Sequence, residues 1–300
     1  MHATLRPLPL ALAAVLSTVS LVGAAVSEID QACALPGCFP GDGPGFPITI
    51  SSGGEYRLTS NIDTRGAAGP ENVTAIQVLP AAGGVDIDLN GFEVRGPVSC
   101  VQATSSCSPA GFGSGVSGSA GTSVRDGSVR GFGANGIALS GAGRVERVRA
   151  WDNGGVGIYA LGEGSMVVDS LAFRNGDDGI HTYRYGVIRG SMVAWNGDDG
   201  VMGSQQSIVD ETVAWANGRV GFWADTEFEV RLSVANQNGN GGLSGFAIAS
   251  VGAGNGTYGI TRGLAWSSAA LQCVLSGNAS APMATFVNSL GQNACNGGGC

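Results

Sequence analysis

One short phrase recurs five times through the middle of the chain at almost constant spacing. Each copy begins with Asn-Gly, continues with two variable residues, and ends with Gly and an apolar residue; the leading asparagines are Asn153, Asn175, Asn196, Asn217 and Asn238. The spacings are 22, 21, 21 and 21 residues. A period in this range is typical of a solenoid, in which each unit buries its apolar face against its neighbours. Residues one period apart are therefore expected to touch.

Short apolar stretches lie between the Asn-Gly phrases. In one repeat they cover residues 157–159, 166–168 and 171–173. Alternation within such strands places Ile158, Val167 and Ala172 inside, and Tyr159 and Phe173 outside. We expect Asn-Gly to supply the positive φ of the corner. Three strands in a coil of about 21–22 residues predict an all-β fold, a single-stranded parallel β-helix, because a propeller blade needs about 40 residues.

The ends of the 300-residue chain differ from its middle. Residues 1–25 read as a signal peptide, with Arg6, an apolar run over 8–22 and small residues at 23–25. The run is too short for a membrane span, so the sequence predicts a secreted protein, extracellular or periplasmic, with no membrane partner. We expect an N-terminal cap segment over 26–47, the β-helix over 48–290 and a C-terminal disulfide loop over 291–300.

The first coils are less regular than the later ones. Strand-like runs occupy residues 48–50, 56–62, 74–78, 85–96 and 124–129. Between them, residues 99–113 are predicted to be an insertion between coils.

Seven cysteines fit the oxidising compartment that a signal peptide implies. Three pairs are close in sequence, which leaves Cys273 over: Cys33 with Cys38, Cys100 with Cys107, and Cys295 with Cys300. The alternative pairs Cys273 with Cys295, about one coil away, and leaves out Cys300.

The charge of the chain limits its partners. All fifteen basic residues are arginine and the formal net charge is −8. Nucleic acid is not expected as a partner, because binding phosphates requires a basic stripe. A cation or a glycan is compatible with this charge.

With these repeats placed, the chain resembles the right-handed parallel β-helix repeat proteins of the pectin-lyase-like superfamily. The resemblance is carried by the Asn-Gly phrases over 153–243 and by the segment VDIDLNGFEVRG at 85–96. It implies a right-handed coil and a polysaccharide ligand, since the relatives include lyases, hydrolases, epimerases and tailspikes. Gly176-Asp177-Asp178 and Gly197-Asp198-Asp199 are similar to a hydrolase motif, but the hydrolases' Gly-His-Gly and Arg-Ile-Lys motifs are missing, as are the epimerase Asp-Pro-His-Asp and the pectate-lyase arginine motif.

The two Asp-Asp pairs are expected to stack, because they are one period apart. At about 5 Å two unit charges repel by roughly 1 kcal/mol in water and about 3 kcal/mol at an intermediate dielectric. A Ca²⁺ ion held by Asp178 and Asp199, or a carboxyl with a raised pKa, would relieve the repulsion. The alternative is that every aspartate points into water at an exposed corner.

Next to these acids lies a predicted outward column of Tyr159, His181, Met202 and Trp223. His181 is the only histidine after residue 25, and it is suited to proton transfer near neutral pH. The predicted catalytic residues are Asp177, Asp178, His181, Asp198 and Asp199. The predicted sugar-binding residues beside them are Tyr159, Tyr183, Arg184, Trp223 and Asp225. The carboxylate separation would decide between retention, at about 5 Å, and inversion, at about 6.5–9.5 Å.

A second candidate surface is aromatic. Trp151, Phe173, Trp195 and Trp215 are predicted to share one outward position, each following an inward alanine: Ala150, Ala172, Ala194 and Ala214. Outward Leu171, Val193, Val213 and Val234 would flank this ladder. Such a surface needs cover, which sugar rings, a second copy of the chain or a terminal segment could supply.

These observations predict a secreted β-helix protein that binds polysaccharide and, if it is an enzyme, acts as a polysaccharide lyase or glycoside hydrolase. The alternative is a non-catalytic module for glycan binding, adhesion or structure.

Overall fold

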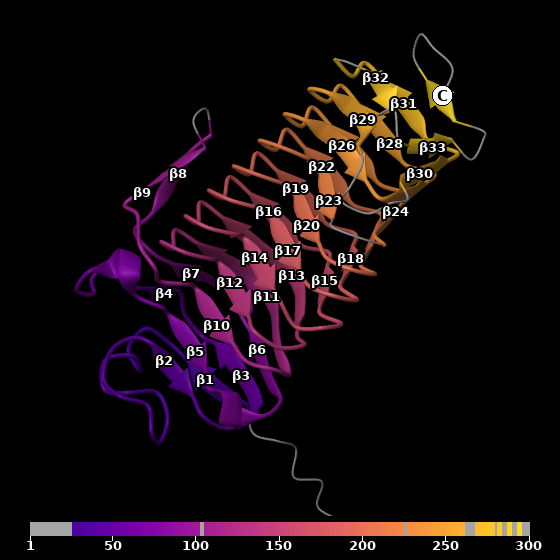
Figure 1. Cartoon of the computed structure of the whole chain (residues 1–300). Helices are drawn as coiled ribbons and strands as arrows, with labels where there is room; N and C mark the ends of the chain where they lie inside the picture. The colour runs from indigo at the N-terminus through magenta and orange to yellow at the C-terminus, as the bar shows by residue number, and fades with distance from the viewer. Residues whose placement is uncertain are drawn as a thin grey trace, which may run out of the picture.

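In a computed structural model, which describes residues 26–102, 105–224, 227–261, 268–279, 281–283, 287–289 and 293–295, the chain forms a rod of stacked coils (Figure 1). It is a right-handed parallel β-helix, so the predicted fold class is confirmed. Strands of successive repeats pair in parallel, with Ile158 beside Ile180 and Val201 beside Phe222. One sequence period is therefore one coil.

One face of the rod is an eleven-stranded parallel sheet with one strand from each coil. It contains β2 (Ile48–Ile50), β5 (Ile76–Val78), β10 (Val116–Gly118), β12 (Ile137–Leu139), β14 (Ile158–Ala160), β17 (Ile180–Thr182), β20 (Val201–Gly203), β23 (Phe222–Ala224), β26 (Gly241–Ser244), β29 (Tyr258–Thr261) and β32 (Ala281–Met283).

The other two strands of each coil belong to a sheet of twenty-one strands, because the long strands β11 and β13 pair with both columns. Its early members are β1 (Ser27–Ile29), β3 (Gly54–Leu58), β4 (Ile62–Asp63), β6 (Val85–Asp88), β7 (Glu93–Arg95), β11 (Thr122–Arg130) and β13 (Arg144–Trp151). The later ones are β15 (Met166–Val168), β16 (Leu171–Phe173), β18 (Val187–Arg189), β19 (Met192–Ala194), β21 (Ile208–Asp210), β22 (Val213–Trp215), β24 (Glu229–Arg231), β25 (Val234–Asn236), β27 (Phe246–Ile248), β28 (Val251–Ala253), β30 (Ser268–Leu271), β31 (Val274–Ser276), β33 (Val287–Ser289) and β34 (Ala294–Cys295).

The core lies inside the coils, as the alternation predicts. Ile158, Val167 and Ala172 are fully buried, whereas Tyr159 and Phe173 on the same strands remain partly exposed. Each coil therefore stacks its apolar side chains on those of the coils before and after it, which buries a continuous core.

The leading asparagines form a buried ladder inside one corner. Each side-chain Nδ2 donates to the Oδ1 of the next asparagine at 2.9–3.2 Å, from Asn153 through to Asn278. From Asn175 onward Nδ2 also donates to a backbone carbonyl, Ala172 in the case of Asn196. The ladder satisfies polar groups that have no water to bind.

The predicted source of the corner's positive φ is wrong. The left-handed residue is the one before each asparagine, such as Asp152 at φ 55° and Trp195 at φ 55°. The glycine after the asparagine is required for close approach instead: a Cβ on Gly197 would lie 2.2 Å from the carbonyl oxygen of Gly176 in the preceding coil.

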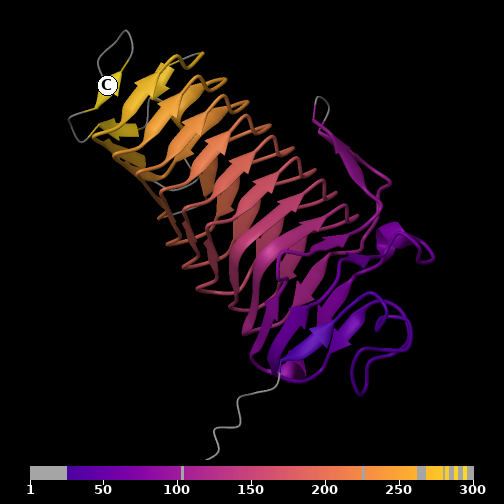
Figure 2. The ribbon, with the colours of Figure 1, turned by 180° about the vertical axis from the view of Figure 1, so that it is seen from behind.

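A hairpin of β8 (Ser99–Val101) and β9 (Ser106–Ser108) leaves the rod within the predicted insertion and lies along its side (Figures 1 and 2). The Cys100–Cys107 disulfide joins its strands, and both sulfurs lie 3.5 Å from the carbonyl oxygen of Asn153. Farther along the rod, the side chains of Cys107 and Ser105 lie beside the places where Gly176 and Gly197, respectively, would carry a Cβ if they were larger residues. The hairpin thus covers the Asn-Gly corner of several coils.

The early coils differ from the expected strands in detail. The run 56–62 is divided between β3 and β4, and the run 85–96 between β6 and β7 by a turn at Asn90 and Gly91, both with positive φ. Two 3-10 turns, η1 (Pro70–Asn72) and η2 (Pro80–Ala82), lie in the same coils. Within the segment 26–47, β1 pairs with β3.

The predicted Cys33–Cys38 and Cys100–Cys107 disulfides are both present. Cys273 is fully buried in the core. The signal peptide at 1–25, Asp225, and the Cys295–Cys300 pairing, which involves Cys300, lie outside the described residues. Among the described residues no helix has the length and apolar character needed to cross a membrane.

Candidate functional site

The outward column of the eleven-stranded sheet carries the predicted polar and aromatic residues. Tyr159, His181, Met202 and Trp223 are consecutive partners across β14, β17, β20 and β23. All four are partly exposed. The rings of Tyr159 and His181 meet edge to face, with centroids 5.0 Å apart. Tyr159, His181 and Met202 line a surface groove, whereas Trp223 at the end of the column does not.

His181 and Asp178 form a pair within this groove. The Nδ1 atom of His181 lies 3.3 Å from Oδ2 of Asp178. Asp178 lies in the corner before β17, and His181 lies on β17, three residues later. Only Gly179 separates Asp178 from the strand, so the two side chains are close together. The Nε2 atom remains as the other proton-binding position of the ring.

The two Asp-Asp pairs stack in successive coils, but two of the four carboxylates do not point into water. Asp178 is 4% exposed and Asp199 is fully buried. Oδ1 of Asp178 accepts the backbone N–H of Asp199 at 3.0 Å, and Oδ1 of Asp199 accepts that of Val220 at 2.9 Å. The water-exposed alternative is therefore wrong for these two residues.

Arg219 supplies the counter-charge in the next coil. It lies 3.1 Å from a carboxylate oxygen of Asp198 and 3.2 Å from one of Asp199, and its guanidinium covers the ring of Trp223 at 5.4 Å. Arg219 occupies the same column as Asp177 and Asp198. Reading that column one coil farther would have identified it from the sequence.

Burial and mutual repulsion raise the pKa of three of these carboxyls. Desolvation raises the pKa of Asp199 to about 7, against the lowering effects of the Val220 N–H and Arg219. Desolvation and the neighbouring charges of Asp178 and Asp198 raise the pKa of Asp177. Desolvation also raises the pKa of Asp198. The column therefore retains protons at a pH where ordinary carboxyls have lost them.

The groove has a volume of about 450 Å³. Its lining brings together most of the predicted acid and histidine residues with three that the sequence reasoning did not single out as functional, Asn135, Val156 and Arg219. The complete lining is Asn135, Val156, Tyr159, Asp177, Asp178, His181, Asp198, Met202 and Arg219. Tyr183 and Arg184 do not line it: Arg184 stacks on the Tyr183 ring at 5.5 Å and lies 3.9 Å from Glu163.

The carboxylates that could share a cation are Asp177, Asp178 and Asp198, each with an oxygen within 4.8 Å of the others. This set differs from the predicted pair of Asp178 and Asp199, because Asp199 faces Arg219. Three oxygens supply at most half of the six to eight that Ca²⁺ prefers. Arg219 already neutralises part of the charge of Asp198. These residues fit at most a weakly held cation.

The predicted four-membered aromatic ladder is wrong. The strand partner of Phe173 is Ala194, whose own partner is Trp215, so Trp195 is one residue out of the column. Val193, predicted outward, is fully buried, and Ala194 is not the inward equivalent of Ala150. The described residues instead contain two separate pairs: Trp151 with Phe173, stacked at 5.6 Å, and Trp195 with Trp215 at 5.0 Å. The continuous ladder behind the predicted oligomer contact is not there.

Arginines cover the first aromatic pair. Arg130 and Arg149 lie 5.8 and 5.1 Å from the Trp151 ring, and Arg174 lies 5.2 Å from Phe173 while bonding both carboxylate oxygens of Asp152. Part of the predicted aromatic surface is thus closed by the chain's own side chains.

Residues 135–278 match the family described as right handed beta helix region. Among solved structures, a pectate lyase, Pel9A, is similar with a TM-score of 0.57 and 14% identity, over 89% of this chain and 79% of the other. A variant of the periplasmic alginate epimerase AlgG is similar with a TM-score of 0.54 and 12% identity, over 82% and 70%. No curated protein matches by sequence. The match and the stacked coils agree that the chain is a right-handed parallel β-helix, the fold that it shares with these two structures.

Proposed function

We propose that the groove on the eleven-stranded sheet binds a polysaccharide and transfers protons on it, as a polysaccharide lyase or a glycoside hydrolase does. The observation that carries the proposal is the contact of His181 with the nearly buried Asp178, at 3.3 Å, in the floor of the groove. The two structurally similar proteins named above are a pectate lyase and an alginate epimerase, which act on polysaccharides.

In this proposal His181 is the base. Asp178 is fixed because its Oδ1 accepts the Asp199 N–H, so its Oδ2 holds the imidazole by Nδ1. The Nε2 lone pair then faces the groove and can remove a proton from a sugar carbon or from water. A carboxylate that orients an imidazole and stabilises its charged form is a common arrangement in catalysis.

Asp177 is the acid. It is exposed at the groove rim, and desolvation and the charges of Asp178 and Asp198 raise its pKa, which favours the protonated form. A protonated carboxyl can give its proton to the glycosidic oxygen as the bond breaks. Proton removal on one side and proton donation to the leaving oxygen serve both elimination and hydrolysis. Tyr159, which lines the groove, provides an aromatic face for a sugar ring.

We also propose that the protein works outside the cytoplasm. Two disulfides join described cysteines, and disulfides persist in oxidising compartments.

The test is turnover of neutral and acidic polysaccharides by the wild type, His181→Ala, Asp178→Asn and Met202→Ala, with reducing ends and unsaturated ends measured separately. We expect the first two variants to lose at least about 100-fold. Met202→Ala alters the same outward column without a proton-transfer group, and it should lose far less. Undiminished turnover by His181→Ala would remove the proposal, and the type of new end assigns the reaction.

A non-catalytic glycan-binding module is the second candidate. It is favoured by the structural use of the acids, since Asp178 and Asp199 each accept a backbone N–H from the following coil. In that case no polysaccharide yields product, glycan binding persists in His181→Ala, and Asp178→Asn lowers only stability.

A further inference from the structure

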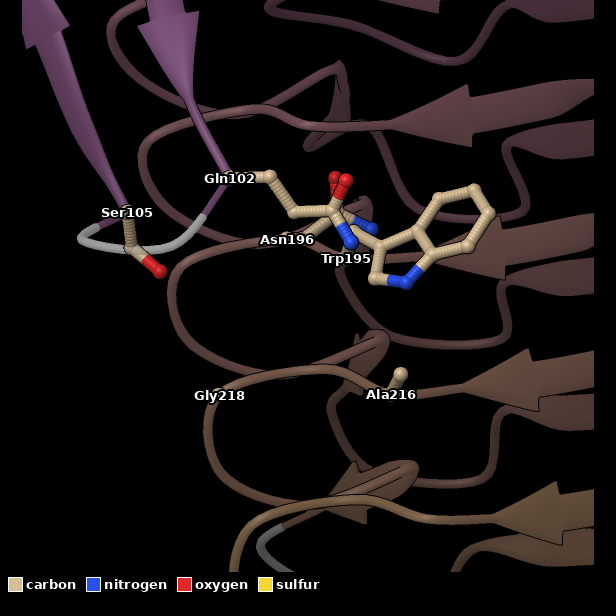
Figure 3. Close-up of a pocket in the computed structure, with 6 residues that line it drawn as sticks. All are labelled: Gln102, Ser105, Trp195, Asn196, Ala216 and Gly218. Atoms are coloured by element: carbon tan, nitrogen blue, oxygen red, sulfur yellow. The ribbon is translucent and has the colours of Figure 1, made fainter.

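A second cleft lies between the solenoid and two residues at the end of the β8–β9 hairpin, Gln102 and Ser105. It has a volume of about 430 Å³, and its lining comes from two distant parts of the chain. Figure 3 shows Gln102 and Ser105 on the hairpin, and Trp195, Asn196, Ala216 and Gly218 on the corners of two coils. The disulfide-anchored hairpin holds one wall of this cleft against the other.

No residue lining the cleft is charged. Amide and hydroxyl groups of Gln102 and Ser105 face an indole, and a second indole, Trp215, lies 5.0 Å from Trp195. Aromatic faces with a few uncharged hydrogen-bonding groups suit a sugar ring, whose axial C–H groups pack on the indole and whose hydroxyls bind the amides. A cleft without cations, in a chain of net charge −8, does not favour an anionic sugar.

Trp195 occupies the left-handed position that precedes each asparagine of the ladder. The residue has φ 55°, a left-handed conformation that costs a bulky L-residue roughly 1–2 kcal/mol. The same position is left-handed in the neighbouring coils, where it holds Arg174 and Ala216, so this φ belongs to the corner. Because Trp195 follows the last residue of β19, its indole lies outside the strand column and lines the cleft.

We propose that this cleft is a second carbohydrate site, which takes an uncharged sugar unit against Trp195 and the hairpin. It is separate from the acid groove, because Trp195 precedes and Asp198 follows the Asn196–Gly197 corner that the hairpin covers. The proposal rests on the proposed function only in taking a glycan as the ligand.

The test is isothermal titration of the full chain with neutral hexasaccharides of cellulose, starch and β-1,3-glucan, and with hexagalacturonate. The variants are Trp195→Gly, Gln102→Ala and, as the control in the acid groove, His181→Ala. Glycine suits the left-handed position, so Trp195→Gly should fold with unchanged or higher stability.

We expect a neutral hexasaccharide to bind the wild type, with affinity at least about tenfold lower in Trp195→Gly, several-fold lower in Gln102→Ala, and unchanged in His181→Ala. Neutral binding that is retained in Trp195→Gly and lost in His181→Ala would overturn this inference and leave the proposed function standing. Preference for hexagalacturonate at the Trp195 site would overturn the uncharged class. Turnover in the acid groove without any neutral binding would also remove the second site alone, whereas absence of every glycan effect would remove both proposals.

Discussion

Two columns of buried polar side chains run along the same corner of the coils, three residues apart in sequence. They differ in how their polar groups find hydrogen-bond partners away from water. The asparagine column extends from Asn153 to Asn278, and every member donates to or accepts from the next. The aspartate column contains only Asp178 and Asp199 before it passes to Val220. The first is neutral, and the second is charged and next to the groove.

The difference follows from the chemistry of the two side chains. An amide carries both a donor and an acceptor, so it can repeat without limit along the stack. An ionised carboxylate only accepts, and a stack of carboxylates needs donors from elsewhere. Here the donors are backbone N–H groups and Arg219. They do not offset the burial of Asp199, which raises its pKa. The amide column supports the fold, whereas the acid column contains a buried carboxyl, Asp199, whose pKa is raised.

The largest effect on stability is expected in the asparagine column. Asn196→Ala leaves the buried N–H of Asn175 and the carbonyl oxygen of Ala172 without partners. At about 1–3 kcal/mol for each orphaned group, plus a cavity, we expect a loss of roughly 3–5 kcal/mol in the free energy of unfolding. Denaturant unfolding measures it. The exposed Asn240→Ala is the control, expected within about 0.5 kcal/mol of wild type, and equal losses in both would refute a structural role for the ladder.

The acid column should make stability fall as pH rises. The pKa of Asp199 is about 7 in the fold, above the ordinary 3.8 of the unfolded chain. Between these values the unfolded state is ionised and the folded state keeps its proton, so the native form loses stability as pH increases. We expect roughly 2–3 kcal/mol between pH 5 and pH 7, at about 1.4 kcal/mol per pKa unit.

Asp199→Asn should remove that slope. The comparison of interest is the difference between its unfolding curve and that of the wild type across this pH range, since other carboxyls contribute equally to both. A difference that does not change with pH would show that Asp199 is ionised throughout.

Replacing Arg219 should change the pH dependence of stability by a smaller amount. Arg219→Met removes the cation beside Asp198 and Asp199, so the pKa of both carboxyls should rise further. We expect the midpoint of the pH-dependent stability to move upward by about one unit. Arg231→Met, which removes an exposed ion pair with Glu229, is the matched control and should leave the midpoint in place. An unchanged midpoint in Arg219→Met would mean that solvent already screens this arginine.

Calcium should have the smallest effect. Asp177, Asp178 and Asp198 offer only a partial shell, so millimolar Ca²⁺ is expected to raise the melting temperature by no more than about 2 °C. Thermal unfolding with and without chelator measures the shift, and Asp177→Asn should abolish it. A much larger shift would indicate a strong site, and one retained in Asp177→Asn would place the ion elsewhere.

The period alone was enough to predict the fold, the inward Ile158 and Val167, and the stacking of the acid pairs. These follow from register, because a constant spacing repeats every local decision in the next coil. The same reasoning missed Asn255, which continues the ladder only 17 residues after Asn238. The coil shortens there, and a fixed period does not find a shortened coil.

The aromatic ladder failed for a reason that is visible in hindsight. If the repeats are aligned on the alanine before each aromatic residue, Trp195 matches Trp215. If they are aligned on the ladder asparagine, Ala194 matches Trp215, as the structure shows. The asparagine is the better reference, because its hydrogen bonds fix it inside the corner. The hairpin cleft had no comparable signal in the sequence, because Gln102 and Trp195 belong to distant parts of the chain and line one cleft through packing rather than through a repeat.

The hairpin also has a consequence for the order of assembly. Its strands are synthesised before the corners at Gly176, Gly197 and Gly218 on which it lies. During synthesis from the N-terminus, the β8–β9 hairpin (the arm) is therefore complete before the coils on which it lies exist. Seating of the arm, and with it the cleft at Trp195, belongs to the late steps of maturation, after the rod has grown past it.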